Sequence, residues 1–159
     1  MSNENPTLAD IRQAECLDIE QIADIIDSIE ELVFQYNLDK GHFIYVGPNS
    51  MEVGKIPRER AYQMNFFDDM LPLAHPDDRD KISETLNLMI ANPGQLYTLE
   101  YRKRNEDGTY DCFRERARSK VDEKSGDLII TGVVRNVTEE KAQLHEINEL
   151  QHRLNEPYK

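Results

Sequence analysis

Residues 97–138 read YTLEYRKRNEDGTYDCFRERARSKVDEKSGDLIITGVVRNVT, and this stretch decides the fold of the chain. Residues 97–102 alternate between apolar and polar side chains, which is typical of a strand with two different faces. Asp107-Gly108 then predicts a hairpin turn, because glycine takes a positive φ without steric strain. Residues 110–121 form a second run, and residues 128–134 form a third that is apolar on both faces, which predicts a central strand covered on both sides. We therefore expect three consecutive antiparallel strands.

Upstream of this stretch the pattern predicts two more strands and a helical middle. Residues 34–38 and 42–46 alternate around a turn, and a short helix follows over residues 50–54. Residues 56–73 mix aromatic residues and methionines without a clean period, which predicts short helices and irregular chain. A clear helix follows over residues 76–91, with proline in its first turn. The fold class is therefore α+β: a five-stranded antiparallel sheet with helices on one face.

Composition limits the kinds of partner. The 159 residues carry a net charge of −12 and the sequence pI is about 4.7, so phosphate backbones and anionic lipids should repel the chain. No apolar run is long enough to span a bilayer, and residues 1–10 do not read as a signal peptide. Cys16 and Cys112 lie in regions of different type and do not predict a disulfide framework. We expect a cytoplasmic chain with no nucleic-acid partner and no membrane partner.

Both ends of the chain read as helical extensions. A helix is predicted from Leu8, and from Ile19 onward apolar residues recur at the spacing of a heptad seam. Such a helix packs on its own domain or pairs with its copy in a homodimer, and the pattern leaves both open. Past Thr138 a second helix has a similar but imperfect seam, for which a two-chain contact is a hypothesis. The N-terminal seam residues are Ile19, Ile22, Ile26, Ile29 and Val33, and those of the C-terminal helix are Leu144, Ile147, Leu150 and Leu154.

Charge is distributed unevenly along the chain. Up to residue 33 the sequence carries many acidic side chains and Arg12 as its single basic one. Arg114, Arg116 and Arg118 share one face of a predicted strand. We therefore expect the acidic N-terminal helix to pack near these arginines, in the same chain or in a partner, through exposed pairs that give orientation more than stability.

Short motifs also occur along the chain in a set order. They are YVGPN at 45–49, HPDDR at 75–79, EYR at 100–102, DGTY at 107–110 and GVVRNVTEEK at 132–141. Together they span about residues 32–141, and their order and spacing resemble a PAS sensor domain of the common bacterial type. In that family the last motif usually reads Asp-Ile-Thr, where this chain has Asn136-Val137-Thr138. Asparagine keeps the hydrogen bonding of aspartate but lacks its charge, which a salt bridge to the outgoing helix would require.

The resemblance implies a five-stranded sheet, a small pocket enclosed by helices on one face, and an N-terminal helix behind the sheet or in a dimer contact. It divides the chain into an N-terminal helical extension at residues 1–31, a PAS domain at residues 32–138 and a C-terminal signalling helix at residues 139–159. It also implies that Asn136, Val137 and Thr138 relay a signal to that helix. The implied role is sensing or interaction, and the fold does not identify a ligand.

The cofactor chemistries of this family lack their residues here. Flavin photochemistry of the LOV type requires a cysteine in the helical middle, and neither cysteine lies there. Haem-binding members typically use a histidine in the long helix, which has none. His75 precedes that helix and is predicted to cap it through a hydrogen bond. The histidines are scattered and no carboxylate cluster has ligand spacing, so no metal site is predicted and the cofactor stays unassigned.

A pocket would be lined by aromatic residues, methionines and other apolar side chains. Such residues at these spacings are more typical of a packed core, in which methionine fills gaps. Glu115 shares strand parity with Phe113 and either points into that core, where it needs a partner, or lies at an exposed strand end. The candidate lining residues are Tyr36, Tyr45, Met51, Met64, Phe67, Met70, Leu86, Ile90, Tyr101, Phe113 and Glu115.

These observations predict a sensory PAS module rather than an enzyme. It would sense a small ligand or a partner, form a homodimer, and act through its C-terminal helix on an effector of the histidine kinase or diguanylate cyclase type. One alternative is a stand-alone interaction or dimerisation module without a ligand. Another is a small α+β enzyme, which needs a buried polar set such as an Asp/His pair, and the sequence displays none.

Overall fold

The computed structural model describes residues 5, 7 and 18–156, so the helix predicted from Leu8 up to residue 17 lies outside the described residues, as does Cys16. No helix among the described residues is both long and apolar enough to cross a membrane. In chain order the elements are α2 (Ile19–Asp27), β1 (Leu32–Asn37), β2 (His42–Val46), α3 (Ser50–Gly54), α4 (Arg58–Ala61), η1 (Phe66–Met70), η2 (Leu71–Leu73), η3 (Pro76–Asp78), α5 (Arg79–Ala91), β3 (Tyr97–Arg104), β4 (Tyr110–Val121), β5 (Leu128–Asn136) and α6 (Thr138–Leu154).

The five strands form one antiparallel sheet in the order β2-β1-β5-β4-β3, which confirms the predicted fold class and the central place of β5. Gly108 closes the β3–β4 turn with a φ of 87°, as the Asp-Gly pair predicts. Gly132 lies opposite Ala117 in the middle of the sheet. A Cβ at Gly132 would lie 2.8 Å from the Cβ of Ala117 and 2.9 Å from the Phe34 ring, so this close packing requires glycine.

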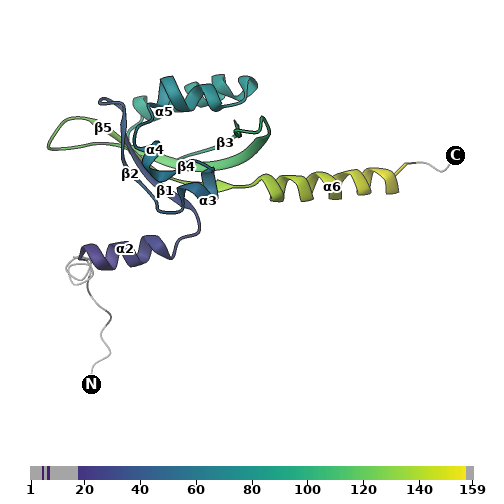
Figure 1. Cartoon of the computed structure of the whole chain (residues 1–159), viewed down its shortest axis with the longest axis horizontal. Helices are drawn as coiled ribbons and strands as arrows, with labels where there is room; N and C mark the ends of the chain where they lie inside the picture. The colour runs from purple at the N-terminus through teal and green to yellow at the C-terminus, as the bar shows by residue number, and fades with distance from the viewer. Residues whose placement is uncertain (1–4, 6, 8–17, 157–159) are drawn as a thin grey trace.

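Helices cover one face of the sheet. In Figure 1, α3, α4 and α5 lie over that face, α2 lies on the other side, and α6 runs away from the domain. Ile130 and Val134 of β5 are buried against the helices. On the opposite face of β5, Ile129 and Val133 are half-buried and Thr131 is exposed. The described residues therefore do not provide the predicted cover on that second face.

The start of the long helix is fixed to β3 by a buried carboxylate. Asp78 accepts hydrogen bonds from the backbone N–H of Arg102 at 2.8 Å and from its guanidinium at 3.0 Å. These bonds from Arg102 lower the pKa of Asp78 to about 2. His75 caps η3, the turn that leads into α5: its Nδ1 accepts from the N–H of Asp77 at 3.1 Å. This confirms the predicted capping role.

The N-terminal helix is shorter than its apolar pattern predicts. A capping box between Asp18 and Gln21 begins α2, and the helix ends at Asp27. Ile29 therefore lies beyond the helix, and Val33 lies in β1, where it pairs with Val133. The prediction of one continuous seam from Ile19 to Val33 is wrong, because the last position belongs to the sheet.

Candidate functional site

A cavity of about 150 Å³ lies between the inner face of the sheet and the helices. Its wall is mostly apolar and is built from alternating positions of β1, β3, β4 and β5 and from the inner side of α5. Cavities of this volume with apolar walls accommodate a molecule about as large as benzene. The ionisable side chains on its wall are Tyr36, Tyr101, Lys103 and Glu115.

The structure brings together part of the predicted lining set. The predicted residues on the wall are Tyr36, Met70, Leu86, Tyr101, Phe113 and Glu115.

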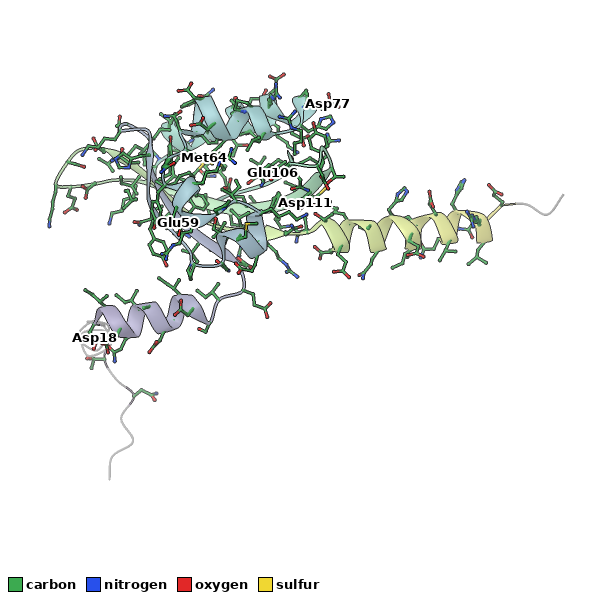
Figure 2. The ribbon with its side chains drawn as sticks, viewed as in Figure 1. Asp18, Glu59, Met64, Asp77, Glu106 and Asp111 are labelled. Carbon is green, nitrogen blue, oxygen red and sulfur yellow. The ribbon has the colours of Figure 1, made fainter. Side chains whose placement is uncertain are left out.

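The other predicted lining residues do not line the cavity. Met64 is buried but does not belong to the wall, and Tyr45 lies under the guanidinium of Arg58, whose carbon is 5.6 Å from the ring centroid. Figure 2 labels Met64 among the side chains of the domain. The remaining three are wrong as lining residues because they face solvent: Met51 is 55% exposed, Phe67 52% and Ile90 46%.

Lys103 is a wall residue that the sequence reasoning missed. It lies two positions after Tyr101 on β3, so strand parity alone places it on the same face as Leu99 and Tyr101. The signal was therefore present, but a lysine at an inward position is easily assigned to solvent, since lysines are rarely buried without a partner.

Glu115 points into the cavity from the middle of β4. It lies opposite Leu99 of β3 and Val134 of β5, both buried and apolar. Among the described residues, no hydrogen bond and no ion pair reaches its carboxyl group. Burial raises the pKa of Glu115 to about 7. The inward orientation, one of the two alternatives for this residue, is the one observed, but without the protein partner that a buried carboxylate needs.

Tyr101 borders the same part of the cavity. Its ring stacks on Phe113 with centroids 5.9 Å apart. Burial, and secondarily the charge of Glu115, raise the pKa of Tyr101 well above its ordinary value. Tyr101 and Glu115 both line the cavity, and both retain some accessible surface.

At the other end of the cavity Lys103 lies near a polar network around Asp111. The ammonium of Lys103 donates to the carbonyl of Gly54 and lies 5.2 Å from the centroid of the Phe113 ring. Burial lowers the pKa of Lys103 to about 8, and the nearby charge of Asp111 opposes that shift. Asp111 also accepts from Lys55 at 2.9 Å. Figure 2 shows Asp111 at the end of the domain from which α6 departs.

The predicted relay residues join this network to α6. The amide of Asn136 donates to Asp111 at 3.1 Å and to the carbonyl of Val53 at 3.2 Å, and its oxygen accepts from the Thr138 hydroxyl at 2.6 Å. The N–H of Cys112 donates to Thr138 Oγ1, and the N–H of Val137 donates to the Cys112 carbonyl, both at 2.8 Å. The asparagine is therefore used for its donor, because an aspartate here would place a second carboxylate beside Asp111.

Ion pairs hold the first turn of α6 against β3 and β4. Lys141 lies 2.8 Å from Glu100, and Arg114 lies 3.5 Å from Glu140 and 3.6 Å from Glu100. Hydrogen bonding from Lys141 leads the effects that lower the pKa of Glu100. The outgoing helix thus has salt bridges to the sheet, although they do not come from position 136.

The prediction that the acidic N-terminal helix packs near the β4 arginines is wrong for the described residues of α2, which form no ion pair with them; the one acidic partner from this part of the chain is Glu31, which follows the helix. Arg116 lies 3.6 Å from Glu31, whereas Arg114 pairs with α6 and with β3 instead. The reason is local: the backbone bond from Val137 to Cys112 starts α6 beside Arg114, while α2 lies away from the sheet (Figure 1).

The comparisons with known proteins agree with this geometry. Residues 58–134 match the family model described as PAS fold, which confirms the resemblance inferred from the motifs. A comparison with the curated proteins finds no match. In the described residues, no group of three or more histidine, cysteine, aspartate or glutamate side chains could hold a metal ion.

Solved structures with the same fold include sensor domains of signalling proteins. A sensory box histidine kinase/response regulator from Burkholderia thailandensis is 18% identical, with a TM-score of 0.63 over 86% of this chain and 98% of that one. The N-terminal domain of a diguanylate cyclase with PAS/PAC sensor from Marinobacter aquaeolei is 18% identical, with a TM-score of 0.59 over 70% and 99%. A PAS domain from Colwellia psychrerythraea is 20% identical, with a TM-score of 0.60 over 76% and 98%. At these identities the likeness concerns the fold.

Proposed function

This chain contains a PAS domain, and from that premise we propose that it is a sensory module whose cavity binds a small molecule and whose α6 helix carries the response. The observation that carries the proposal is the cavity itself, about 150 Å³ of space inside an otherwise packed core. Protein interiors are packed about as densely as organic crystals, so a void of this size forgoes contacts that a ligand would restore.

The cavity and α6 share one strand. Phe113 forms part of the cavity wall, and its neighbour Cys112 holds Val137 and Thr138 through its backbone. Phe113 and Cys112 are consecutive residues of β4, with side chains on opposite faces of the sheet. A shift of the strand at Phe113 therefore also moves the Cys112 backbone, to which the base of α6 is bonded. On β5, Val134 of the wall lies two residues before Asn136 of the relay. A ligand changes the position of α6 only to the extent that it binds one arrangement of these strands better than the other.

The effector and the dimer belong to the same proposal. We place an effector of the kinase or cyclase type after α6, because the sensor domains of such proteins share this fold. We also assign the exposed apolar residues of the two terminal helices to a homodimer contact, since exposed apolar stripes of this kind are characteristic of helix pairing. These residues are Ile19, Ile22 and Ile25 of α2 and Leu144, Ile147, Leu150 and Leu154 of α6; Ile25 replaces Ile26 of the predicted seam, which is less exposed.

A stand-alone interaction module remains a second candidate, and the same exposed residues favour it. The two functions differ in the cavity, because an interaction module would use its helices without a ligand. Replacement of Leu144 and Leu150 by aspartate should shift a dimer to a monomer in native mass spectrometry. An unchanged mass would place the dimer contact elsewhere.

The main experiment tests binding and relay together in the full chain. Ethylbenzene, a neutral apolar probe of suitable size, is titrated while hydrogen exchange of the Val137 and Thr138 amides is followed. The variant Thr85→Met adds volume at the cavity wall, and Asn87→Met places the same side chain on the exposed side of α5.

We expect binding in the parent and in Asn87→Met, loss of binding in Thr85→Met, and altered exchange at Val137 on binding. Absence of binding in the parent would contradict the sensory cavity. Binding without any change at Val137 or Thr138 would contradict the relay.

A further inference from the structure

We propose that the molecule bound in this cavity carries a protonated amine on a small apolar group, and that the Glu115 carboxylate is the group that recognises it. This inference deepens the proposed sensory function and rests on it. It concerns the chemical class of the ligand, which neither the fold nor the family match specifies.

Glu115 has no hydrogen-bond or ion-pair partner among the described residues. A carboxyl group taken from water into an apolar environment is destabilised unless it receives hydrogen bonds or an opposite charge. The strand neighbours of Glu115 on the inner face are Phe113 and Ala117, and its cross-strand neighbours are Leu99 and Val134. None of these side chains carries a donor. Among the described residues, the carboxyl group therefore has no hydrogen bond or ion pair that supplies what burial removes.

Charge is distributed unevenly around the cavity. Glu115 is the only carboxylate and Lys103 the only basic side chain among the described residues of the wall, and no charged side chain of α5, β1 or β5 reaches it. Tyr36 and Tyr101 have raised pKa values, so both are neutral around neutral pH.

Lys103 does not neutralise Glu115. Its ammonium is engaged by the Gly54 carbonyl, and Lys103 lies four residues along β3 from Leu99, the residue opposite Glu115, which is about 13 Å of strand. A cationic ligand at the Glu115 end would therefore meet an unpaired negative charge, and it would stay clear of the positive charge at the other end.

The volume of the cavity and the polarity of its wall limit the size and polarity of the ligand. The volume of about 150 Å³ and the apolar wall suit a single ring of about the size of benzene with at most a short substituent. Among molecules of that size, one with a single ammonium pairs with Glu115 through a charge-assisted hydrogen bond, and its apolar part fills the rest of the space. Benzylamine and ethylbenzene are close in shape and differ in the amine, so they separate the contribution of charge from that of filling.

The experiment measures the affinities of benzylamine and ethylbenzene for the full chain by calorimetry. Glu115 is half ionised near pH 7, so benzylamine should bind about eightfold more tightly at about pH 7.5 than at about pH 6, a range in which Lys103 stays mostly protonated. Ethylbenzene should show no such rise. Glu115→Gln should weaken benzylamine about tenfold or more, abolish its pH dependence and leave ethylbenzene bound.

A control variant removes a carboxylate that is not part of the cavity wall. Glu100→Gln removes a carboxylate from the outer face of β3, so it should leave the affinity for benzylamine and its pH dependence unchanged. Equal binding of benzylamine by the parent and Glu115→Gln, or binding of ethylbenzene alone, would overturn the proposed recognition of an amine while leaving a ligand-binding cavity. Failure of both probes to bind the parent would overturn the sensory cavity and the inference with it.

Discussion

The polar groups at the two ends of the cavity differ in whether they have partners, although β3 and β4 contribute to both ends. At one end Lys103 donates to the Gly54 carbonyl, and Asp111 accepts from Asn136 and pairs with Lys55, so each of these groups has a partner. At the other end Glu115 has none among the described residues. The difference fits the two roles proposed above, in which the saturated end stabilises the fold and anchors α6, and the unsaturated end binds a ligand at a cost in stability.

The free energy of unfolding should fall most when a polar group is removed from the end of the cavity that contains Asp111. Asp111→Ala removes the acceptor of Lys55 and Asn136 and the anion near buried Lys103. We expect the free energy of unfolding to fall by about 3 kcal/mol, measured by denaturant titration, because a buried cation loses its compensating charge. Glu106→Ala, at an exposed position in the neighbouring turn (Figure 2), is the control and should change it by no more than about 0.5 kcal/mol. Similar effects of the two variants would mean that the network is not what holds this end.

The amide at position 136 offers a sharper test of the same end. Asn136→Asp replaces the donor to Asp111 by a like charge, and the free energy of unfolding should fall by about 2 kcal/mol near neutral pH. The deficit should shrink in acid, because protonation of one carboxyl group restores a donor. Stability measured against pH, with Asn87→Asp as the exposed control, checks this. A variant as stable as the parent at neutral pH would show that Asp111 tolerates a second carboxylate.

Removal of the charge at Glu115 should raise the free energy of unfolding, whereas the substitutions at the other end lower it. Its folded-state pKa of about 7 lies above the ordinary value of 4.5, so the folded state binds this proton more tightly and stability falls as pH rises through that interval. Glu115→Gln should therefore stabilise the chain by about 2 kcal/mol at about pH 8 and by little at about pH 4.5. Thermal unfolding at both pH values tests the sign. A destabilised variant at the higher pH would break the contrast between the two ends.

The smallest effect is expected where the sheet meets α6. The pKa of Glu100 is lowered, mainly by Lys141, so this carboxylate stabilises the fold above its unfolded-state pKa and ceases to do so as pH falls. Glu100→Gln should destabilise the chain by about 0.5 kcal/mol near neutral pH, because the pair is partly exposed and screened. Faster hydrogen exchange in the first turn of α6, absent in the control Glu139→Gln, would accompany the loss. Unchanged exchange would mean that the Cys112 bonds alone hold the helix.

Much of this arrangement could be predicted from residue patterns. Strand alternation placed Phe113, Glu115 and Tyr101 on one face, and the Asp-Gly turn fixed the pairing of β3 with β4. The inward face of the helical middle was harder to predict. Phe66 and Met89 pack inward, whereas the next residues, Phe67 and Ile90, face solvent. Short irregular helices have no period long enough to assign the inward face. Val33 was misassigned for a related reason, since a heptad spacing continued from a helix into a strand.

Local pattern therefore determined the five strands and the long helix, their order, the central place of β5 and the strand parity of Glu115, because these depend on the spacing of neighbours along the chain. Tertiary structure alone decided that Glu115 would have no partner, that Lys103 would find Gly54, and that Asn136 would donate to Asp111. Those outcomes depend on which atoms of distant segments come within hydrogen-bond distance, and a side chain's position on a strand does not specify what the opposing layer places in front of it.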